Sequence, residues 1–280
     1  MIRLFLLPLI SFFVLPSSAL AEEITDSIEV GGRVLRIPAP GGFVRCDGVN
    51  AEWDKVMASM QAPANRMLVT YGSHTDQEAI RAGTPADYSK NFNIQVISQL
   101  EAKEIGTDTF AGIRDQTSEE VKSAVAKVEK EVNKTMAEGS RKISDQLGVD
   151  TALSISDTAM LGVFQEDAQS FGFTMALKLK VSTPKGTEDS KSVVAAMMQP
   201  VNGRLLLFYA TMPYLSENDR KEAETSVKAW ADAVFAANPQ VKGPPARPGL
   251  FDGVGRSGLI GAIVGGLLGV IFMVKKKITG

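Results

Sequence analysis

The chain contains one thiol and one imidazole, Cys46 and His74, among its 280 residues. A cysteine and a histidine that meet in a folded protein can act as nucleophile and general base. Cys46 follows Val44 and Arg45 in a strand-like segment, where a lone cysteine is most often a small buried residue. We therefore expect a structural role for Cys46, and the Cys46–His74 pair is the catalytic alternative.

Carboxylates in polar segments form a second group that could do chemistry. Paired carboxylates can exchange protons with a substrate, alone or together with His74. Solvated surface charge is the default interpretation of such residues. A hydrolase that uses them with His74 is therefore an alternative to a non-enzymatic protein, and the sequence leaves open whether the chain is an enzyme. The carboxylates, all expected in loops, are Asp76, Glu78, Asp87, Asp108 and Asp115.

Composition argues against several other kinds of site. One His excludes zinc sites that need two His ligands, and one Cys excludes a disulfide framework. Gly253, Gly255 and Gly258 match the glycine spacing of a dinucleotide-binding loop, but no strand precedes them. The 30 basic side chains nearly balance the 32 acidic ones, whereas a nucleic-acid-binding surface should show a clustered basic excess. We expect no metal, no cofactor and no nucleic-acid partner.

The first 21 residues have the pattern of a secretory signal peptide. An apolar run from Leu4 to Leu15 is too short to span a bilayer, and Ala19-Leu20-Ala21 supplies the small residues of a cleavage site. We predict cleavage after Ala21, which would export the chain that follows.

Near the other end, residues 257–274 carry no charge and are followed by three lysines. At 1.5 Å per residue, a helix of this length just crosses a hydrocarbon core of about 30 Å. Lysines favour the cytoplasmic side, so residues 275–280 are expected to form a basic cytoplasmic tail. With the signal peptide, this predicts a single transmembrane helix in the inner (plasma) membrane and residues 22–256 outside the cytoplasm.

A ridge of small residues runs along the predicted membrane helix. Gly261, Gly265 and Gly269 recur every four residues, and such a ridge lets two helices approach closely in lipid. We expect self-association or pairing with another membrane helix, although glycine is also simply common in membrane helices. In a further alternative, the spacer, apolar segment and lysines are a sorting tag that is removed after export.

Between these ends, residues 22–237 predict one α+β domain and residues 238–256 a Pro- and Gly-rich spacer. Strict alternation over 171–181 indicates a strand of an antiparallel sheet. Gly31-Gly32 is expected to form a turn between two short strands, and Asn202-Gly203 is a strong hairpin signal. We expect an antiparallel sheet packed on one face by helices. Strands are predicted at 28–30, 34–37, 67–71, 92–97, 171–181, 193–198 and 205–209, and helices at 51–60 and from a cap at Ser216 to 237.

A third predicted helix has a narrow stripe of valines. Thr117 and Glu120 have the spacing of a capping box, and apolar residues recur at three and four positions from Val121 to Met136. We therefore predict one long amphipathic helix that begins at Thr117 and extends to about residue 147. A helix lying across the sheet is favoured over a coiled coil, because fewer than three clean heptads are present.

Two segments near the ends of the predicted domain have a recognisable order. The first is VLRIPAPGGFVRC, a strand that runs into a Pro-x-Gly-Phe turn, and the second is a closing hairpin and helix, AAMMQPVNGRLLLFYATMPYLSENDRKEAETSVKAWADAVFAANP. In these segments the chain resembles the PsbP-like and Mog1-like α+β domains. Together the two segments cover about a third of the chain. The resemblance implies a non-catalytic scaffold for assembly or for binding a partner or ligand, and it transfers no functional residue.

The combined prediction is a membrane-anchored module on the periplasmic side of the cell envelope. Its function would be binding or assembly rather than catalysis, with an unknown envelope partner or ligand. The spacer would hold the folded domain away from the lipid surface, and the glycine ridge would cluster copies or recruit another membrane helix.

Overall fold

A computed structural model describes residues 25–59, 61, 64–123, 137, 140–141, 144, 152–184 and 186–243. The predicted signal peptide, membrane helix and basic tail lie outside these residues, as do Gly261, Gly265 and Gly269. The predicted spacer is described only from 238 to 243. Within the described part of the chain, no helix combines the length and apolarity needed to cross a membrane.

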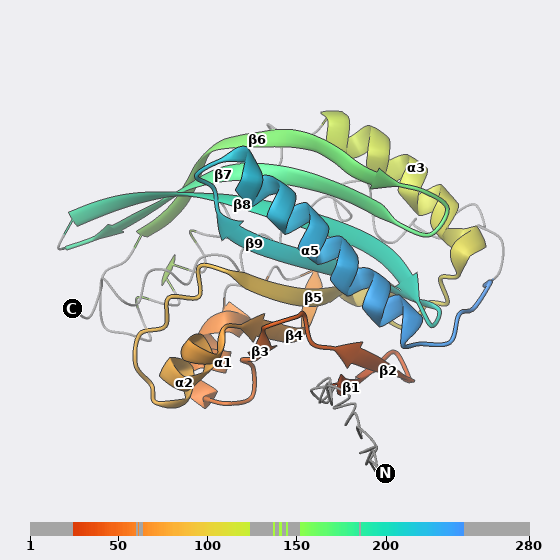
Figure 1. Cartoon of the computed structure of the whole chain (residues 1–280), viewed down its shortest axis with the longest axis horizontal. Coiled ribbons are helices and arrows are strands. Elements are labelled where there is room, and N and C mark those ends of the chain that lie inside the picture. The colour runs from red at the N-terminus through yellow and green to blue at the C-terminus, as the bar shows by residue number, and fades with distance from the viewer. Residues whose placement is uncertain are drawn as a thin grey trace, which may run out of the picture.

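The centre of the domain is a seven-stranded antiparallel sheet, and a separate two-stranded hairpin packs beside it (Figure 1). The strand order in the large sheet is β3-β4-β5-β9-β8-β7-β6. Its strands are β3 (Val44–Arg45), β4 (Asn65–Gly72), β5 (Asn91–Ile97), β6 (Ala152–Glu166), β7 (Phe171–Thr183), β8 (Gly186–Val201) and β9 (Arg204–Pro213); the hairpin is β1 (Thr25–Val30) and β2 (Arg33–Pro38).

Both tight hairpins follow the sequence prediction. Gly31 and Gly32 join β1 to β2, and Asn202 and Gly203 join β8 to β9; all four residues have positive φ angles, between 47° and 78°. Two successive residues with positive φ match the right-handed twist of the strands that they connect. Glycine and asparagine adopt this backbone conformation at low cost, which explains why these residues stand at the turns.

The helices cover both faces of the sheet, not one as predicted. On one face lies α5 (Glu217–Ala236), which buries Val227 and Trp230 against β8 and β9. Buried side chains of the β1–β2 hairpin belong to the same apolar cluster. On the other face lie α1 (Ala51–Ser59), α2 (His74–Arg81) and α3 (Thr107–Ser123), whose buried side chains belong to one apolar cluster with Phe171 and Phe173 of β7. The physical reason is that β8 and β9 are buried on both sides, and their unbroken apolar runs are the sequence pattern of such strands.

The start of α3 corrects a second prediction. Thr117 is not a cap but a buried residue inside the helix, where its hydroxyl donates to the carbonyl of Ile113 over 2.8 Å. The helix begins ten residues earlier, at Thr107, because Phe110 and Ile113 are both fully buried in the core. Most of the valine stripe lies outside the described residues, so the predicted extension to 147 stays a prediction.

Two elements were not predicted from the sequence. Helix α2 is capped by Ser73, whose hydroxyl accepts from the Asp76 amide, while Asp76 accepts from the Ser73 amide. Strand β6 has a weak alternating pattern, and its pairing with β7 is interrupted by three register shifts. Bulges of this kind blur the two-residue period that identifies a strand. The Ser-x-x-Asp spacing at 73–76 was the signal that could have found α2.

Candidate functional site

The two candidate catalytic residues occupy different environments. Cys46 follows β3 and is fully buried, with its Sγ 3.5 Å from the carbonyl oxygen of Val44. Burial raises the pKa of the Cys46 thiol to about 12, so the reactive thiolate is scarce at neutral pH. His74 is the first residue of α2 and is exposed. Cys46 is therefore a core residue, as expected.

The candidate carboxylates are distributed over helices rather than loops. Asp76 and Glu78 lie in α2, Asp108 and Asp115 lie in α3, and Asp87 is in the connection after α2. The prediction was wrong for the first four because both helices were missed in these segments. Asp76 is buried and accepts hydrogen bonds from the backbone of Ser73 and of Tyr88, at 3.1 and 2.8 Å. Among the described residues, no cluster of His, Cys, Asp and Glu has the arrangement of a metal site.

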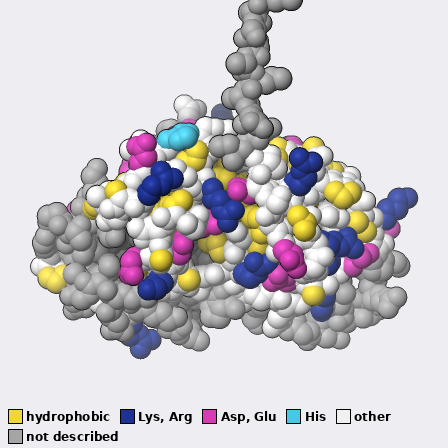
Figure 2. All heavy atoms as spheres, turned by 90° about the horizontal axis from the view of Figure 1, so that it is seen from below, with side chains coloured by type: hydrophobic (Ala, Val, Ile, Leu, Met, Phe, Trp, Pro, Cys, Tyr) yellow, Lys and Arg dark blue, Asp and Glu magenta, His cyan; other side chains and the backbone are white. Residues whose placement is uncertain are grey.

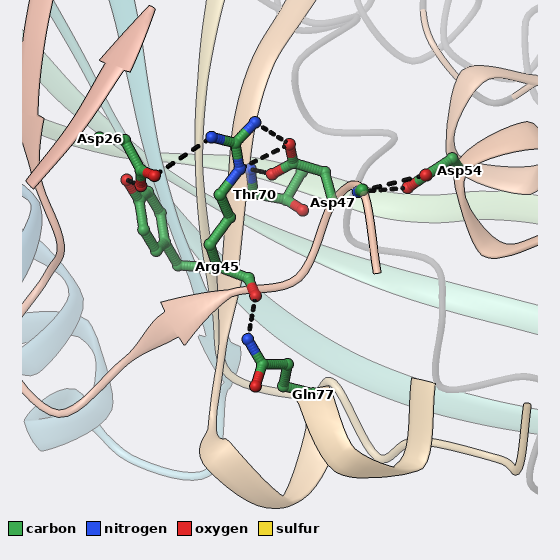
Figure 3. A network of polar contacts seen from close by, with 8 residues as sticks. Asp26, Arg45, Asp47, Asp54, Thr70 and Gln77 are labelled. Atoms are coloured by element: carbon green, nitrogen blue, oxygen red, sulfur yellow. Dashed lines mark hydrogen bonds and ion pairs between the residues drawn. The ribbon is translucent and has the colours of Figure 1, made fainter. Parts of the chain in front are cut away.

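A polar network around Arg45 was not anticipated from the sequence (Figure 3). The guanidinium donates to Asp47 Oδ2 through Nε at 2.9 Å and through a terminal nitrogen at 2.6 Å, and its other terminal nitrogen donates to Asp26 at 3.1 Å. Asp47 Oδ1 also accepts from the backbone amide of Thr70 at 2.7 Å. Burial by itself would lower the pKa of Arg45, but the hydrogen bonds and negative charges of Asp47 and Asp26 outweigh it. The pKa of Arg45 is therefore raised above its ordinary value.

This network ties three parts of the fold together. Asp26 belongs to β1 of the hairpin, Arg45 to the edge strand β3, and Thr70 to β4. The backbone carbonyl of Arg45 also accepts a hydrogen bond from Gln77 of α2, over 2.6 Å (Figure 3). Because each charge here has an opposite charge or a backbone group as partner, the network fixes the position of the hairpin rather than presenting free groups to a substrate.

The other end of the hairpin is held by Arg204. Its guanidinium donates to the carbonyl oxygens of Val30, Gly31, Lys103 and Gly203, over 2.5 to 3.2 Å. At the same end, the hairpin turn lies close to the backbone of Glu101: a Cβ atom built on Gly31 would lie 2.1 Å from the Glu101 carbonyl oxygen. Burial lowers the pKa of Arg204, but a guanidinium stays protonated at physiological pH.

The third polar feature is a buried patch on the face of the sheet that packs against α1, α2 and α3. Alternate residues of β5 point to this face, and strand register places Thr70 of β4 beside Asn93 and Thr211 of β9 beside Asn91. Each member is about 1% exposed. We call this set the inner polar patch: Thr70, Asn91, Asn93, Gln95 and Thr211.

Hydrogen bonding within the inner polar patch is incomplete. Gln95 donates to Asn93 at 2.9 Å and accepts from Asn65 at 2.8 Å, and Asn91 donates to the carbonyl of Tyr88 at 3.0 Å. The hydroxyl of Thr211, in contrast, has no hydrogen-bond partner among the described residues, and the hydroxyl of Thr70 faces the phenol of Tyr88. Leaving a buried hydroxyl unpaired costs about 1–3 kcal/mol, so the patch is an unusual feature for a core. In the sequence of β5, the polar members of the patch alternate with Phe92, Ile94 and Val96. This pattern is the one expected of an ordinary strand with one face in solvent, so nothing in the sequence indicated that the polar face is buried.

Tyr88 covers the patch from the connection after α2. Its ring packs on Gly72, where a Cβ atom would approach the ring to 2.7 Å, and meets Trp53 of α1 edge to face at 5.1 Å. The residue is fully buried with a φ of 46°, a conformation that costs free energy outside glycine. Burial raises the pKa of the Tyr88 phenol, the neighbouring Thr70 hydroxyl acts in the opposite direction, and the Tyr88 hydroxyl makes no hydrogen bond of normal geometry.

Comparison with known proteins identifies no sequence relative: no protein-family model matches, and no curated protein matches in sequence. Two solved structures are similar over 77% of the chain. One is the Ran-binding protein Mog1p of Saccharomyces cerevisiae, with 12% identity, 90% of its length covered and a TM-score of 0.25. The other is cyanobacterial PsbP (CyanoP) from Synechocystis sp. PCC 6803, with 15% identity, 93% covered and a TM-score of 0.24. The weak resemblance predicted from the sequence is thus found again in the structure, but scores this low indicate no function for this chain.

Proposed function

We propose that this chain is an exported, membrane-anchored binding or assembly module whose α+β domain lies outside the cytoplasm. The anchorage rests on the sequence of the two ends, a signal peptide over 1–21 and a membrane helix over 257–274. The domain would project from the inner membrane on the spacer that follows α5. Clustering would come from the glycine ridge of the membrane helix.

One observation carries the non-enzymatic part of the proposal: Cys46 and Asp76, the two buried residues among the candidates for chemistry, hold the fold together, as do the carboxylates around Arg45. Cys46 is sealed in the core, and the carboxylates of Asp26 and Asp47 are paired with Arg45. Asp76 caps a helix and holds Tyr88. Side chains engaged in this way stabilise the domain, and catalysis would require them to leave these contacts.

The exposed surface is suited to a protein partner. Figure 2 shows basic and acidic side chains interspersed with apolar ones across one face, rather than gathered by sign. Two large apolar side chains are strongly exposed among the described residues, Val34 at 63% and Leu215 at 88%. Leu215 directly precedes α5, at the end where that helix begins. Single exposed apolar side chains are ordinary on protein surfaces, so Leu215 is a position from which to look for a partner rather than evidence for one.

Site-specific photo-crosslinking in intact cells tests this function. A photoreactive residue at Leu215 should capture a defined envelope protein or a second copy, whereas the same residue at exposed Thr187, near the start of β8, should not. The captured complex should sediment with membranes and should disappear from membranes when residues 257–280 are deleted. A soluble cytoplasmic protein, or a protein that loses its cellular role when His74 and Asp87 are replaced together, would contradict the proposal.

A further inference from the structure

We propose that the domain faces the membrane with one end, at which the turns at 31–32 and 202–203 meet the start of α3. We call this the anchor end. The proposal rests on the proposed membrane anchorage and adds the orientation of the domain above the bilayer. It starts from the route by which the chain leaves the domain towards the predicted membrane helix at 257–274. Residues 238–243, which we call the strap, follow α5 and are the last described part of the chain.

The strap begins at Asn238, which ties the end of α5 to the N-terminal hairpin. The side-chain amide of Asn238 donates to the carbonyl oxygens of Arg36 and Val234, both at 2.7 Å, and its Oδ1 accepts from the Arg36 amide at 2.9 Å. Asn238 thus bonds both backbone groups of Arg36 in β2, as a neighbouring strand would. Its side chain is buried, at 6% exposed, so the chain stays attached to the domain beyond α5.

The strap ends against the start of α3, and Figure 1 shows it running there from the end of α5. The carbonyl oxygen of Lys242 accepts from the amide of Asp108 at 3.4 Å. A Cβ atom built on Gly106 would lie 2.0 Å from the same carbonyl oxygen, so the two backbones are in direct contact. Gly243 has a φ of 71°, a conformation that glycine adopts at low cost. The described chain therefore leaves the domain beside the start of α3.

Both tight hairpin turns lie at this same end. The amide of Ile105, which precedes Gly106, donates to the carbonyl oxygen of Gly203 at 3.0 Å. Arg33, directly after the β1–β2 turn, donates to the carbonyl oxygen of Asn202 at 2.6 Å. These contacts connect the β1–β2 turn to the β8–β9 turn and the β8–β9 turn to the start of α3. The strap therefore leaves the domain at the anchor end.

The other end of the large sheet lies far from the strap. β8 begins at Gly186, which pairs with Thr183 of β7, and its 16 residues run to Val201 at the anchor end. At about 3.3 Å per residue the two ends of β8 are roughly 50 Å apart. Residues 244–256 connect the strap to the predicted membrane helix, and fully extended at about 3.1 Å per residue they reach roughly 40 Å. This tether keeps the anchor end near the bilayer, and the Gly186 end of β8 is on average the more distant one.

The orientation decides which surfaces another envelope protein can reach. The amide of Tyr214 donates to the carbonyl oxygen of Lys191 at 2.9 Å, which places the start of α5 beside β8. Leu215 lies just before α5 and is therefore roughly 30 Å along β8 from the anchor end. A partner that meets the domain at Leu215 would bind it away from the lipid, whereas the two turns face the bilayer.

Energy transfer to labelled lipids tests this orientation on the full chain reconstituted in phospholipid vesicles. A fluorescent amino acid replaces either Val34, close to the β1–β2 turn, or Thr187, near the start of β8. Both side chains are exposed on strands, so neither replacement disturbs the core. The acceptor dyes are attached to the headgroups of the lipids. Because transfer falls steeply with distance, it should be clearly stronger from position 34 than from position 187.

A longer spacer provides the matched control, because it leaves the domain itself unchanged. Insertion of about twenty Gly and Ser residues after Gly243 raises the r.m.s. length of a flexible spacer from about 20 to about 30 Å. Transfer from position 34 should then fall towards the value at position 187, while the Tm of the domain stays the same.

Two results would overturn the orientation alone, in a protein that floats with the vesicles. One is equal transfer from the two positions, and the other is stronger transfer from position 187. Failure of the chain to float with the vesicles would overturn the proposed anchorage, and the orientation with it. Flotation and energy transfer are measured separately on the same sample, so the two failures are distinguishable.

Discussion

The hydroxyl of Tyr71 donates a hydrogen bond to Asp26 Oδ2 over 2.7 Å, across 45 residues of sequence. Tyr71 is a fully buried residue of β4 in the large sheet, and Asp26 belongs to β1 of the separate hairpin. The other oxygen of the same carboxylate accepts from Arg45. One side chain thus connects the two sheets, and its loss should release one end of the hairpin.

Replacing Tyr71 by Phe should destabilise the domain by about 1–3 kcal/mol, because a hydrogen bond to a charged group is lost inside the protein. Urea unfolding followed by tryptophan fluorescence measures this free energy. Tyr214→Phe is the matched control, since Tyr214 also donates to a carboxylate, Glu217, at 2.6 Å but on the exposed surface. The control should change stability by less than about 0.5 kcal/mol. Equal effects of both substitutions would show that the bond to Asp26 does not hold the hairpin.

The segment after α5 packs tightly on the start of α3, and Gly106→Ala should disrupt this contact. A Cβ atom at Gly106 would lie 2.0 Å from the carbonyl oxygen of Lys242, which is backbone and cannot turn aside. We expect a loss of about 1–3 kcal/mol. Gly41→Ala is the control, because nothing lies within 4 Å of its Cβ position. Comparison of the Tm of the two variants checks the prediction, which fails if they unfold together.

Stability should fall at high pH because of three buried tyrosines. Burial raises the pKa of Tyr71, Tyr88 and Tyr209 above the ordinary value of about 10. Below pH 10 the phenols are protonated in both folded and unfolded chains, so their contribution to stability is fully present. Above pH 10 only the unfolded chain ionises, and each tyrosine then lowers the free energy of unfolding by up to about 1.4 kcal/mol per pH unit.

The alkaline loss is measured by urea unfolding at a series of pH values above 9. Tyr209→Phe should reduce the slope with pH, whatever its effect at neutral pH, because it removes one group that ionises only in the unfolded chain. Tyr214 provides the comparison: the pKa of this half-buried tyrosine is raised by its hydrogen bond to Glu217 rather than by deep burial, so Tyr214→Phe should reduce the slope less. A slope that is the same in wild type and Tyr209→Phe would mean that Tyr209 ionises normally in the folded protein.

The Cys46 thiol should react slowly with alkylating reagents in the folded protein. It is fully buried and its pKa is raised to about 12, first by burial and then by the charge of Asp76. Mass spectrometry after iodoacetamide treatment at pH 8 should show little modification under native conditions and complete modification in denaturant. Fast modification of the native protein would contradict a core role and restore the thiol as a candidate nucleophile.

The glycine ridge of the predicted membrane helix should mediate association. Gly265→Leu should weaken association in a membrane two-hybrid assay, because a bulky side chain keeps the two helices apart. Ile263→Leu is the control, since at 100° per residue Ile263 would lie on the opposite side of the predicted helix from the ridge. Unchanged association of the Gly265 variant would leave the clustering without support.

Mass spectrometry of the mature protein tests the sorting-tag alternative, which requires a C-terminus that ends before Ser257.

Much of the local structure followed from the sequence. Glycine and asparagine marked both hairpin turns, and Ser216 with Asp219 marked the start of α5, because a turn or a cap depends on residues that are neighbours in the chain. The same logic failed at Thr117, where burial of Phe110 and Ile113 overrides a local capping pattern. The buried position of Cys46 was also predictable, since a lone cysteine in a strand-like segment is most often a small core residue.

Only the tertiary structure decided how these elements combine. The strand order places β9 between β5 and β8, so polar residues of β4, β5 and β9 meet in one buried patch although they are far apart in the chain. The bond from Tyr71 to Asp26 and the layer of Tyr88 over Thr70 arise in the same way. A sequence pattern states which face of one strand is apolar. Which strand lies beside it depends on the packing of the whole core, and this packing decided where the candidate site is.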